Sequence, residues 1–551
     1  MNFLTSPKYA IRLLRQLLHP LPAPACGLLL LVFSAVRAQL PPSYWATGFS
    51  GADSVATTKG VAGKALDLSK NAKTRRSLDF SMDTTAAIRN FSFTIWVNTD
   101  PTSGKEYTIA STLLPGKKDF WSIGVTAEGA WFFKARFRDE FYEYRATAPR
   151  QSIRDGKWHL LALTYSADDR ELRFYRDGIR VATYLASPYL RFLSSGNLTL
   201  GASRAGRNYR QFWKFPYTTQ PFYTTWETYN GLIDDVSIYE ATLTDTAIAR
   251  YYRQISGSAV PAAYTPAPTS GLTVTTHNIK HGGNVFGAET GRANLAEILR
   301  KTDSDVYLIV ETEGSGAYLA DALGYQFYLV GSNDTANLAI ISRYPIIKSY
   351  PLSRPFTAGG VQISLPGNQK VNIFSVCLDW QPAYFFYSFD NNEGWSVERF
   401  LEEDDRTRGR EIREILRKIS QCLAETDSIP LIIGGDFDSG SHLDYVAATR
   451  KQHKGYVVNW NASRIKAEAG FKDSFREIYP DPVKMPGITF SLAFEVWMND
   501  RIDFIYYKGN RLRAVASRII SEHPVQFPSD HAALNTTFAV SNKRSQRISP
   551  Y

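Results

Sequence analysis

Cysteine is scarce in this chain of 551 residues, which contains only three. So few cysteines cannot build the disulfide framework that stabilises small secreted domains, and hydrophobic cores must therefore stabilise the fold. Apolar runs of membrane-spanning length are also missing, which predicts no stable insertion into a membrane. A chain of this length is expected to form two domains, each large enough to bury a sizeable core.

Residues 1–38 have the organisation of a secretory signal peptide. They contain four basic residues and no acidic residue, and the apolar stretch Gly27–Ala35 precedes a small-residue cleavage site at Val36–Ala38. The apolar stretch has about half the length that a membrane-spanning helix needs, so cleavage is expected rather than retention as an anchor. The mature protein is therefore predicted to be secreted or periplasmic.

Positive charge exceeds negative charge only modestly. The formal net charge is +10, and removal of the four basic residues in 1–38 lowers it to +6. A dedicated nucleic-acid-binding protein usually carries a denser basic pattern. Composition therefore does not point to nucleic acid as the main partner, and it sets no oligomeric state.

A change of composition divides the chain near residue 260. Residues 256–270 are rich in Pro, Ala, Ser and Thr and contain no charged residue, which is typical of a semi-extended tether. We therefore expect one domain at 41–255 and another at 271–540. Because such a linker implies few contacts across it, the two halves are predicted to fold separately.

Residues 41–255 are predicted to form an all-β domain. Short segments alternate apolar and polar residues between turn-forming Gly, Asp and Ser, as half-buried strands do. This spacing predicts a sandwich of two sheets, each of which buries one face. The expected strands include 91–99, 159–166, 172–178, 197–203 and 232–240.

The same half resembles a laminin-G-like, concanavalin-type jelly roll. The resemblance implies either a carbohydrate- or polymer-binding module that holds an enzyme near its substrate, or a spacer without a ligand. The matching segments are GKALDLS (63–69), FTIWV (93–97), DGKWHLLALTYS (155–166), ELRFYRDGIRV (171–181) and GLIDDVSIYEATLTDTAI (231–248).

Two features bear on a ligand of this half. The aromatic-rich segment 208–229 could stack on sugar rings or could fold back as a hydrophobic loop cluster. Asp234 and Asp235 could contribute to a calcium site, but adjacent residues of a strand point to opposite faces. The pair is therefore a weak signal for Ca²⁺.

Several segments of the second half place metal-binding or proton-handling side chains at the ends of predicted strands. Most of these strands are β-branched and apolar runs, typical of strands buried on both faces. Polar residues at strand ends lie at the rim of a sheet, where sheet enzymes place their chemistry. Together the segments indicate a metal-assisted hydrolase. They are TVTTHN with Asn278, VYLIVE with Glu311, NIFSVCLDW with Cys377 and Asp379, LIIGGDFD with Asp436 and Asp438, RIDFIYY with Asp503, and PSDHAAL with Asp530 and His531.

The order of these segments resembles the endonuclease/exonuclease/phosphatase superfamily, to which deoxyribonuclease-I-like nucleases belong. The resemblance covers about 271–540 and implies an α/β four-layer sandwich, in which helices flank two central sheets. Two residues depart from the family pattern: Cys377 stands where histidine is usual, and Asp438 where asparagine is usual. Supporting segments are 337–346, 408–416, 439–445 and 469–482.

The chemistry of a phosphate ester explains the need for a cation. A hard divalent ion neutralises charge on the phosphate and on the leaving oxygen. One or two protein carboxylates suffice to bind Mg²⁺, because this ion keeps several waters. Glu311 ends a buried strand and is the strongest ligand candidate, and the resemblance adds Asn278 and Asp530. The predicted cofactor is Mg²⁺ or Mn²⁺.

Four residues are the predicted catalytic groups. Asp436 follows two glycines that let its carboxylate approach a ligand closely, and the resemblance implies that it activates or orients water. The resemblance also places Asp438 against the phosphate, which an acid repels unless it is protonated or faces a metal. Asp503 is expected to orient His531 and to raise its basicity. His531 would then donate to a phosphate oxygen in the transition state.

Cys377 is a poor replacement for the usual histidine, because a thiol is a weak donor and a thiolate adds negative charge. We expect it to be a small buried residue rather than a nucleophile. His281, shortly after Asn278, could substitute for the missing histidine or could be a surface loop residue. Asp379 is a further supporting candidate.

The substrate is the property that the sequence determines least. An insertion at 380–406 has many aromatic residues in its first part and an acidic run in its second part. The acids would repel a nucleic-acid duplex, or they simply begin the helix expected at 406–424. The leading hypothesis is an exported phosphoesterase for a small or lipid-like phosphate ester. An extracellular nuclease and a catalytically inactive binding protein are the alternatives.

Overall fold

A computed structural model describes residues 43–541 with internal gaps. The gaps are at 44, 48–55, 70–76, 83–88, 113–119, 139, 194–195, 203–227, 262–270, 285–286, 333–336, 353, 383–394, 494–495 and 497–498. Several expectations therefore lie outside the described residues. They concern the signal peptide, most of the aromatic segment 208–229, most of the linker and part of the insertion at 380–406.

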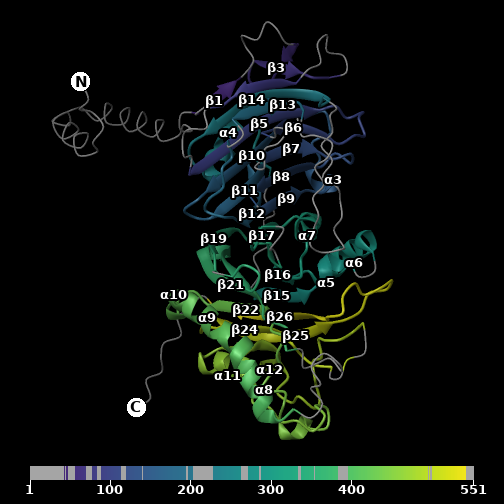
Figure 1. Ribbon diagram of the computed structural model, residues 1–551, viewed down its shortest axis with the longest axis vertical. Helices are drawn as coiled ribbons and strands as arrows, with labels where there is room; N and C mark the ends of the chain where they lie inside the picture. Colours follow the sequence, from purple (N-terminus) through teal and green to yellow (C-terminus); the bar gives the residue numbers. More distant parts are fainter. Residues whose placement is uncertain are drawn as a thin grey trace, which may run out of the picture.

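The N-terminal half is a sandwich of two antiparallel sheets (Figure 1), and the expected strands are present. The first sheet has the order β4 (Leu78–Ser81), β13 (Asn197–Leu200), β6 (Tyr107–Ser111), β7 (Phe120–Val125), β8 (Trp131–Phe137) and β9 (Glu140–Arg145). The second has the order β2 (Thr57–Lys59), β3 (Lys64–Asp67), β14 (Gly231–Tyr239), β5 (Asn90–Thr99), β10 (His159–Ser166), β11 (Glu171–Arg176) and β12 (Ile179–Leu185), with β1 (Trp45–Thr47) also paired to β14.

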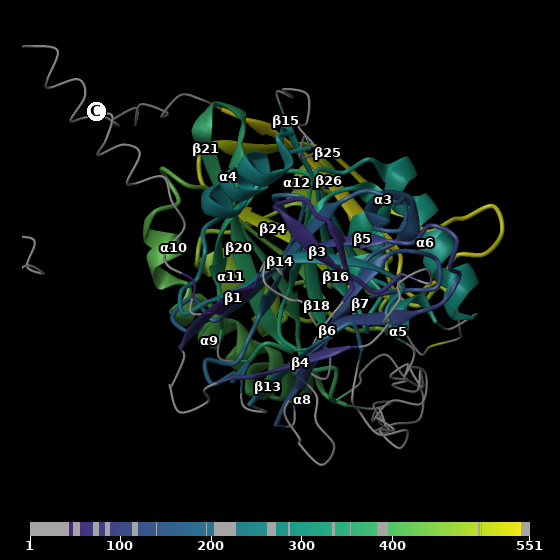
Figure 2. The same ribbon diagram turned by 90° about the horizontal axis from the view of Figure 1, so that it is seen from above.

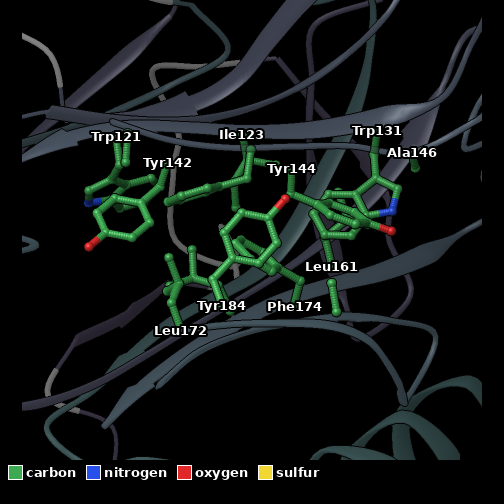
Figure 3. Close-up of a cluster of buried hydrophobic side chains, with 14 of the residues drawn as sticks. Trp121, Ile123, Trp131, Tyr142, Tyr144, Ala146, Leu161, Leu172, Phe174 and Tyr184 are labelled. Atoms are coloured by element: carbon green, nitrogen blue, oxygen red, sulfur yellow. The ribbon is translucent and has the colours of Figure 1, made fainter. Parts of the chain in front are cut away.

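Large aromatic side chains from the inner faces of both sheets fill the space between them (Figure 3). Trp131 and Tyr144 come from the first sheet, and Phe174 and Tyr184 from the second. Phe174 stacks on Tyr144 at a centroid distance of 5.1 Å and meets Tyr184 edge-on at 5.0 Å. Each such pair adds about 0.5–1.5 kcal/mol beyond the burial of its apolar surface. The alternation seen in the sequence thus corresponds to these inward-facing positions.

Two helices flank this sandwich. α4 (Asp245–Ser256) begins at Thr244, whose hydroxyl accepts the backbone N–H of Ala247 (3.2 Å). Its Tyr252 stacks on Trp96 of the second sheet, with ring centroids 5.6 Å apart. The short helix α3 (Ala148–Gln151) lies at the end of β9, facing the other half of the chain.

The C-terminal half has two facing sheets with helices outside them, and this confirms the predicted fold class. One sheet contains β17 (Gln326–Leu329), β18 (Leu338–Ser342), β16 (Val306–Val310), β15 (Gly271–Asn278), β26 (Ala533–Val540) and β25 (Leu512–Ile520) in this order. The other contains β19 (Ile346–Tyr350), β20 (Ala358–Leu365), β21 (Gln369–Cys377), β22 (Leu431–Asp436), β24 (Asp503–Lys508) and β23 (Lys472–Asp473). A core of residues such as Val274, Leu308, Ile373 and Ile505 lies between the two sheets.

The helices of this half pack on the outer faces of the two sheets. α6 (Ala288–Thr302) and α7 (Gly316–Leu323) pack on β16 through a shared core. α9 (Arg410–Lys418), α10 (Ser420–Ala424) and α11 (Asn461–Glu468) cover the outer face of β21 and β22. The shorter elements are α5 (Lys280–Gly283), η1 (Pro366–Asn368), α8 (Val397–Asp404), the π-helical segment η2 (Asp405–Gly409), η3 (Ala447–Thr449) and α12 (Ser474–Ile478).

The acidic run of the insertion begins the expected helix, which starts earlier than 406: α8, η2 and α9 follow one another without a break from Val397 to Lys418. Ser396 caps α8 by accepting the backbone N–H of Arg399 (3.3 Å). Asp404 is buried and accepts from Ser439 Oγ (2.8 Å) and from the backbone N–H of Ala462 (2.9 Å). Asp404, the buried acid of this run, therefore helps to fix the helix against the segments that contain Ser439 and Ala462.

The two halves are joined by more than a linker, and the prediction of few contacts between them is wrong. β12 pairs in parallel with β17, so one sheet continues from the N-terminal half into the C-terminal half (Figure 1). Tyr184 on β12 meets Phe327 on β17 edge-on, with ring centroids 5.8 Å apart. A single hydrophobic core includes side chains from both halves. The composition of 256–270 gave no information on these strand edges, which lie far from it in sequence.

Polar contacts reinforce the junction. The buried carboxylate of Asp321, on α7, accepts the backbone N–H of Thr147 (2.8 Å) and Nε2 of Gln151 (2.5 Å). On the other side, Arg180 donates to the carbonyl oxygen of Ile346 (2.5 Å). The view from above places the N-terminal strands over those of the C-terminal half (Figure 2). The halves thus stack along the long axis of the molecule.

Two other expectations can be compared with the described residues. Asp234 accepts the backbone N–H of Ala62 (2.9 Å), and Asp235 accepts the hydroxyl of Tyr251 (2.6 Å). These separate structural roles give no support to a calcium site. No helix within the described ranges is long and apolar enough to cross a membrane.

Candidate active site

The predicted site residues converge because strands of opposite direction meet at one rim. Asn278, Cys377 and Asp436 end β15, β21 and β22. Asp503, however, begins β24, and Asp530 and His531 precede β26. Since β24 is antiparallel to β22 and β26 is antiparallel to β15, the start of one strand lies beside the end of its neighbour. The expectation that every site residue follows its strand was therefore wrong for these segments, although the rim was predicted correctly.

His531 is held by a buried carboxylate, as the sequence predicted. Its Nδ1 lies 2.9 Å from Asp503 Oδ2, and Asp503 is fully buried. Burial lowers the pKa of His531, but the charges of Asp503 and Asp436 outweigh that effect and raise the pKa to about 10. The imidazole is thus kept protonated at neutral pH, with Nε2 3.9 Å from Asp436 Oδ2. A protonated imidazole with one nitrogen held by Asp503 can donate to an anionic oxygen through the other.

The backbone around His531 is tied to the end of β15. Ser529 donates its hydroxyl to the carbonyl oxygen of Asn278 (2.6 Å) and accepts the backbone N–H of His531 (3.0 Å). The fully buried His277 places Nε2 3.1 Å from the carbonyl oxygen of His531. The ring of Phe490 packs on the imidazole at a centroid distance of 4.7 Å. The position of His531 is therefore set by several segments far apart in sequence.

Asn278 links the two carboxylates of the site. Its Nδ2 donates to Glu311 Oε1 (3.0 Å) and to Asp436 Oδ2 (2.9 Å), while its Oδ1 accepts the backbone N–H of Lys280 (3.0 Å). Burial raises the pKa of Glu311, but the charge of Lys280 and the hydrogen bond from Asn278 outweigh burial and lower it. Burial and the charge of Asp503 raise the pKa of Asp436. Asp436 is thus suited to accept a proton, and Glu311 to stay ionised.

Oxygen donors around Glu311 fit a hard divalent cation. His281, Glu311 and Glu313 form one group of potential ligands, and Asp436, Asp503 and His531 form another, with ligand atoms within 4.8 Å in each group. Carboxylate oxygens are the ligands that Mg²⁺ and Mn²⁺ prefer. Glu311 and Glu313 have 22% and 19% of their side chains exposed, so a hydrated ion can reach them.

The loops that carry these ligands have an unusual backbone. Lys280, His281, Glu311 and Glu313 all have positive φ, between 31° and 55°. Side chains other than glycine are strained in this region, and such strain is concentrated at functional sites. Ser315 donates to the carbonyl oxygen of Gly282 (2.6 Å) and so fastens the two loops together. The tertiary structure therefore holds the two loops in a strained conformation.

Cys377 lies in a third group with Asp436 and Asp438, again with ligand atoms within 4.8 Å. Burial, followed by the charges of Asp436 and Asp438, raises the pKa of the Cys377 thiol well above its usual value. The thiol is therefore neutral and buried, as expected. His281 instead hydrogen-bonds Glu313 (2.8 Å) and lies on the Glu311 side of the site. His281 and Cys377 belong to different groups of potential ligands, and the hypothesis that His281 replaces the family histidine stays a prediction.

Asp438 is the second departure from the family pattern. Burial and the charge of Asp436 raise its pKa well above the usual value, while Arg408 acts in the opposite direction. A carboxyl with a raised pKa is neutral below that pKa and charged above it. The raised pKa favours the protonated side chain, which resembles the asparagine that is usual at this position.

The Asp438→Asn protein is expected to match the parent in turnover on a phosphodiester at low pH and to exceed it at high pH. The gain should be roughly fivefold, on the order of 1 kcal/mol for one repulsive charge near the phosphate. It appears only above the raised pKa, where the parent carries the charge and the variant does not. The check is a pH–rate profile of both proteins, with the exposed Asp427→Asn change as control. Superimposable profiles would show that Asp438 does not face the phosphate.

Three residues were missed by the sequence reasoning. Lys280 has its ammonium 3.3 Å from Asp530 Oδ2, and Glu313 joins the group around Glu311. Asn337 accepts the backbone N–H of Glu311 (2.9 Å) and donates to the carbonyl oxygen of Phe356 (3.2 Å). The supporting segment 337–346 contained a signal for Asn337. Asp379, by contrast, is exposed; its side chain accepts the backbone N–H of Gln381 (3.1 Å) in a turn, and its backbone N–H donates to Glu411 (2.9 Å).

Comparisons with known proteins agree with this arrangement. Residues 275–531 match the model of the Endonuclease/Exonuclease/phosphatase family. An uncharacterized protein of Caenorhabditis elegans is 32% identical over 256 residues, which are 44% of this chain and 80% of that protein. The chain belongs to the endonuclease/exonuclease/phosphatase family. Residues 74–249 match the concanavalin A-like lectin/glucanases superfamily, so this family member carries both resemblances that the sequence indicated.

Several solved structures are similar to this family member. Truncated TDP2 of Caenorhabditis elegans is 18% identical, with 49% of this chain and 98% of that chain covered and a TM-score of 0.35. An AP endonuclease of Archaeoglobus fulgidus is 15% identical (49% and 100% covered, TM-score 0.36). The human Nocturnin catalytic domain, with bound sulfate, is 15% identical (50% and 100% covered, TM-score 0.35). Similarities at this level add nothing to the assignment of function.

Proposed function

We propose that the protein is a divalent-metal-dependent phosphoesterase that hydrolyses a phosphodiester or phosphomonoester with activated water. The observation that carries this proposal is the buried Asp503–His531 pair beside Asp436, at the same rim as Asn278 and Glu311. An acid, a base and oxygen donors for a cation are all needed to break a phosphate ester, and they converge here.

Each residue has a role that follows from its surroundings. Glu311, next to Asn278, would hold Mg²⁺ or Mn²⁺, which when bound neutralises charge on the phosphate. Asp436 has a raised pKa and would take the proton from the attacking water. His531, protonated and held through Nδ1 by Asp503, would donate from Nε2 to a phosphate oxygen. Donors placed in advance at the developing charge stabilise the transition state.

We infer a small or lipid-like phosphate ester as the substrate, because large apolar side chains lie exposed beside the site. Phe356 is 56% exposed and its carbonyl oxygen accepts a hydrogen bond from Asn337, and Trp380 is 46% exposed three residues after Cys377. Such side chains suit an apolar group attached to the phosphate better than the charged backbone of a duplex. We further propose that the mature enzyme is exported, after removal of 1–38, and that the N-terminal sandwich binds a carbohydrate or polymer.

The Glu311→Gln protein should lose nearly all metal-dependent hydrolysis of bis-p-nitrophenyl phosphate, roughly a hundredfold or more, because the amide removes the anionic metal ligand. Parent activity should disappear with a chelator and return with Mg²⁺ or Mn²⁺. Glu468→Gln is the matched control, since Glu468 lies 60% exposed in a surface pair with Arg464. Full activity of Glu311→Gln would contradict the proposed ligand.

The alternative functions give different results in the same experiment. A nuclease would cleave plasmid DNA, with activity that falls steeply as salt is raised. A binding protein would release no p-nitrophenol with any metal. Neither alternative predicts the combination of chelator-sensitive hydrolysis of a small diester and inactivity on plasmid DNA.

A further inference from the structure

Lys280 is the cationic side chain that the proposed mechanism leaves without a role. It lies two residues after Asn278, in the loop at the end of β15, and its backbone has a φ of 49°. Its N–H donates to Asn278 Oδ1 (3.0 Å), so the same amide that orients Glu311 and Asp436 also positions this loop. The side chain is 29% exposed and points to the acids of the site.

The closest of these acids is Asp530. The ammonium nitrogen lies 3.3 Å from Asp530 Oδ2, whereas His531 Nε2 lies 3.9 Å from Asp530 Oδ1. The Asp530 side chain is only 2% exposed, and neither of its carboxylate oxygens accepts a hydrogen bond from the described residues. A buried carboxylate requires a compensating positive charge. Lys280 supplies that charge to Asp530.

This pairing affects the number of metal ions. Asp530 was expected from sequence to be a metal ligand, and a divalent ion on Asp530 would have to share space with the ammonium of Lys280. Two cations about 4 Å apart repel each other strongly in a partly buried site. Asp530 therefore serves a second ion only if Lys280 moves away or is removed.

We propose that Lys280 acts as a built-in cation that neutralises Asp530, so that the centre binds a single divalent ion at Glu311. This inference rests on the proposed metal-dependent function and specifies its metal content. Lys280 is a positioning residue in this scheme, because its charge acts on the acids of the metal site, on Asp530 at 3.3 Å and on Glu311. Its effect is therefore visible in metal binding itself, without any substrate.

The test is a titration of the full metal-free protein with Mn²⁺. Calorimetry and the electron paramagnetic resonance signal of free Mn²⁺ measure how many equivalents bind. The parent is expected to bind one equivalent. Lys280→Met keeps the apolar stem but removes the charge, and it is expected to bind a second, weaker equivalent at the released Asp530. Lys484→Met is the control, since Lys484 is 85% exposed on the surface, and it should bind like the parent.

Two further variants keep the test decisive if Lys280→Met does not fold. Asp530→Asn is expected to keep the single equivalent with an affinity within about threefold of the parent, whereas Glu311→Gln should lose it by at least about a hundredfold. A parent that binds two equivalents, a Lys280→Met protein that still binds one, or loss of binding in Asp530→Asn would each overturn the inference. A parent that binds no Mn²⁺ would instead contradict the metal-dependent function itself.

Discussion

A protein shortened to begin at Gly271 is expected not to fold into a soluble, active enzyme. Removal of the N-terminal half takes away β12, which pairs with β17, and exposes the edge of a sheet that is otherwise continuous. It also exposes Phe327, Leu329 and other side chains of a core shared by both halves. Unpaired apolar edge strands promote aggregation, and lost burial costs about 25 cal/mol for each Å² of apolar surface.

Expression of this shortened protein beside a chain that begins at Gln39 provides the measurement. The longer chain should be soluble, elute as a folded protein in size-exclusion chromatography and unfold cooperatively on heating. The shortened protein should give little soluble material, elute as aggregates and show no cooperative thermal unfolding. The buried Asp321 supports the same expectation, because it would lose its hydrogen bonds from Thr147 and Gln151. A soluble monomer with the turnover of the longer chain would restore the tether model that composition suggested.

The His531→Ala protein is expected to lose roughly a thousandfold in kcat on a phosphodiester, with a smaller change in KM. General acid catalysis is worth about 10²- to 10⁴-fold, and the imidazole of His531, with its pKa raised to about 10, is protonated at neutral pH. Circular dichroism and the Tm control for misfolding. A parent rate retained in His531→Ala would remove this residue from the mechanism.

Asp503→Asn separates the position of His531 from its charge. The amide keeps the size of the side chain, but the charge that raises the pKa of His531 is gone, so this pKa should fall. His531 donates only when protonated, which is below its pKa. The alkaline limb of the pH–rate profile should therefore move to lower pH in Asp503→Asn. An unchanged alkaline limb would mean that His531 is not the proton donor.

The sequence by itself determined which segments form sheets and which form helices, and it determined that the candidate active site lies at the rim of the sheets in the C-terminal half. The apolar run before Glu311 predicted a strand buried on both faces, and β16 is one. The alternation in 159–166 predicted a strand with one buried face, but α4 packs on the other face of β10 and all eight residues are buried. The pairing of Asp503 with His531 was also predictable, because a buried acid and a histidine beside neighbouring strands have few other partners. Side-chain chemistry alone supported these conclusions.

Only the tertiary structure decided how the halves join and how the charges of the site balance. The pairing of β12 with β17 depends on backbone N–H and C=O groups that every strand has. No side-chain pattern therefore predicts which strands pair. Lys280, His281 and Glu313 reach the site through backbone conformations of positive φ, which the surrounding loops impose. The ion pair between Lys280 and Asp530 joins segments 250 residues apart in sequence. Such contacts arise from the packing of the whole chain, and periodicity within a segment cannot encode them.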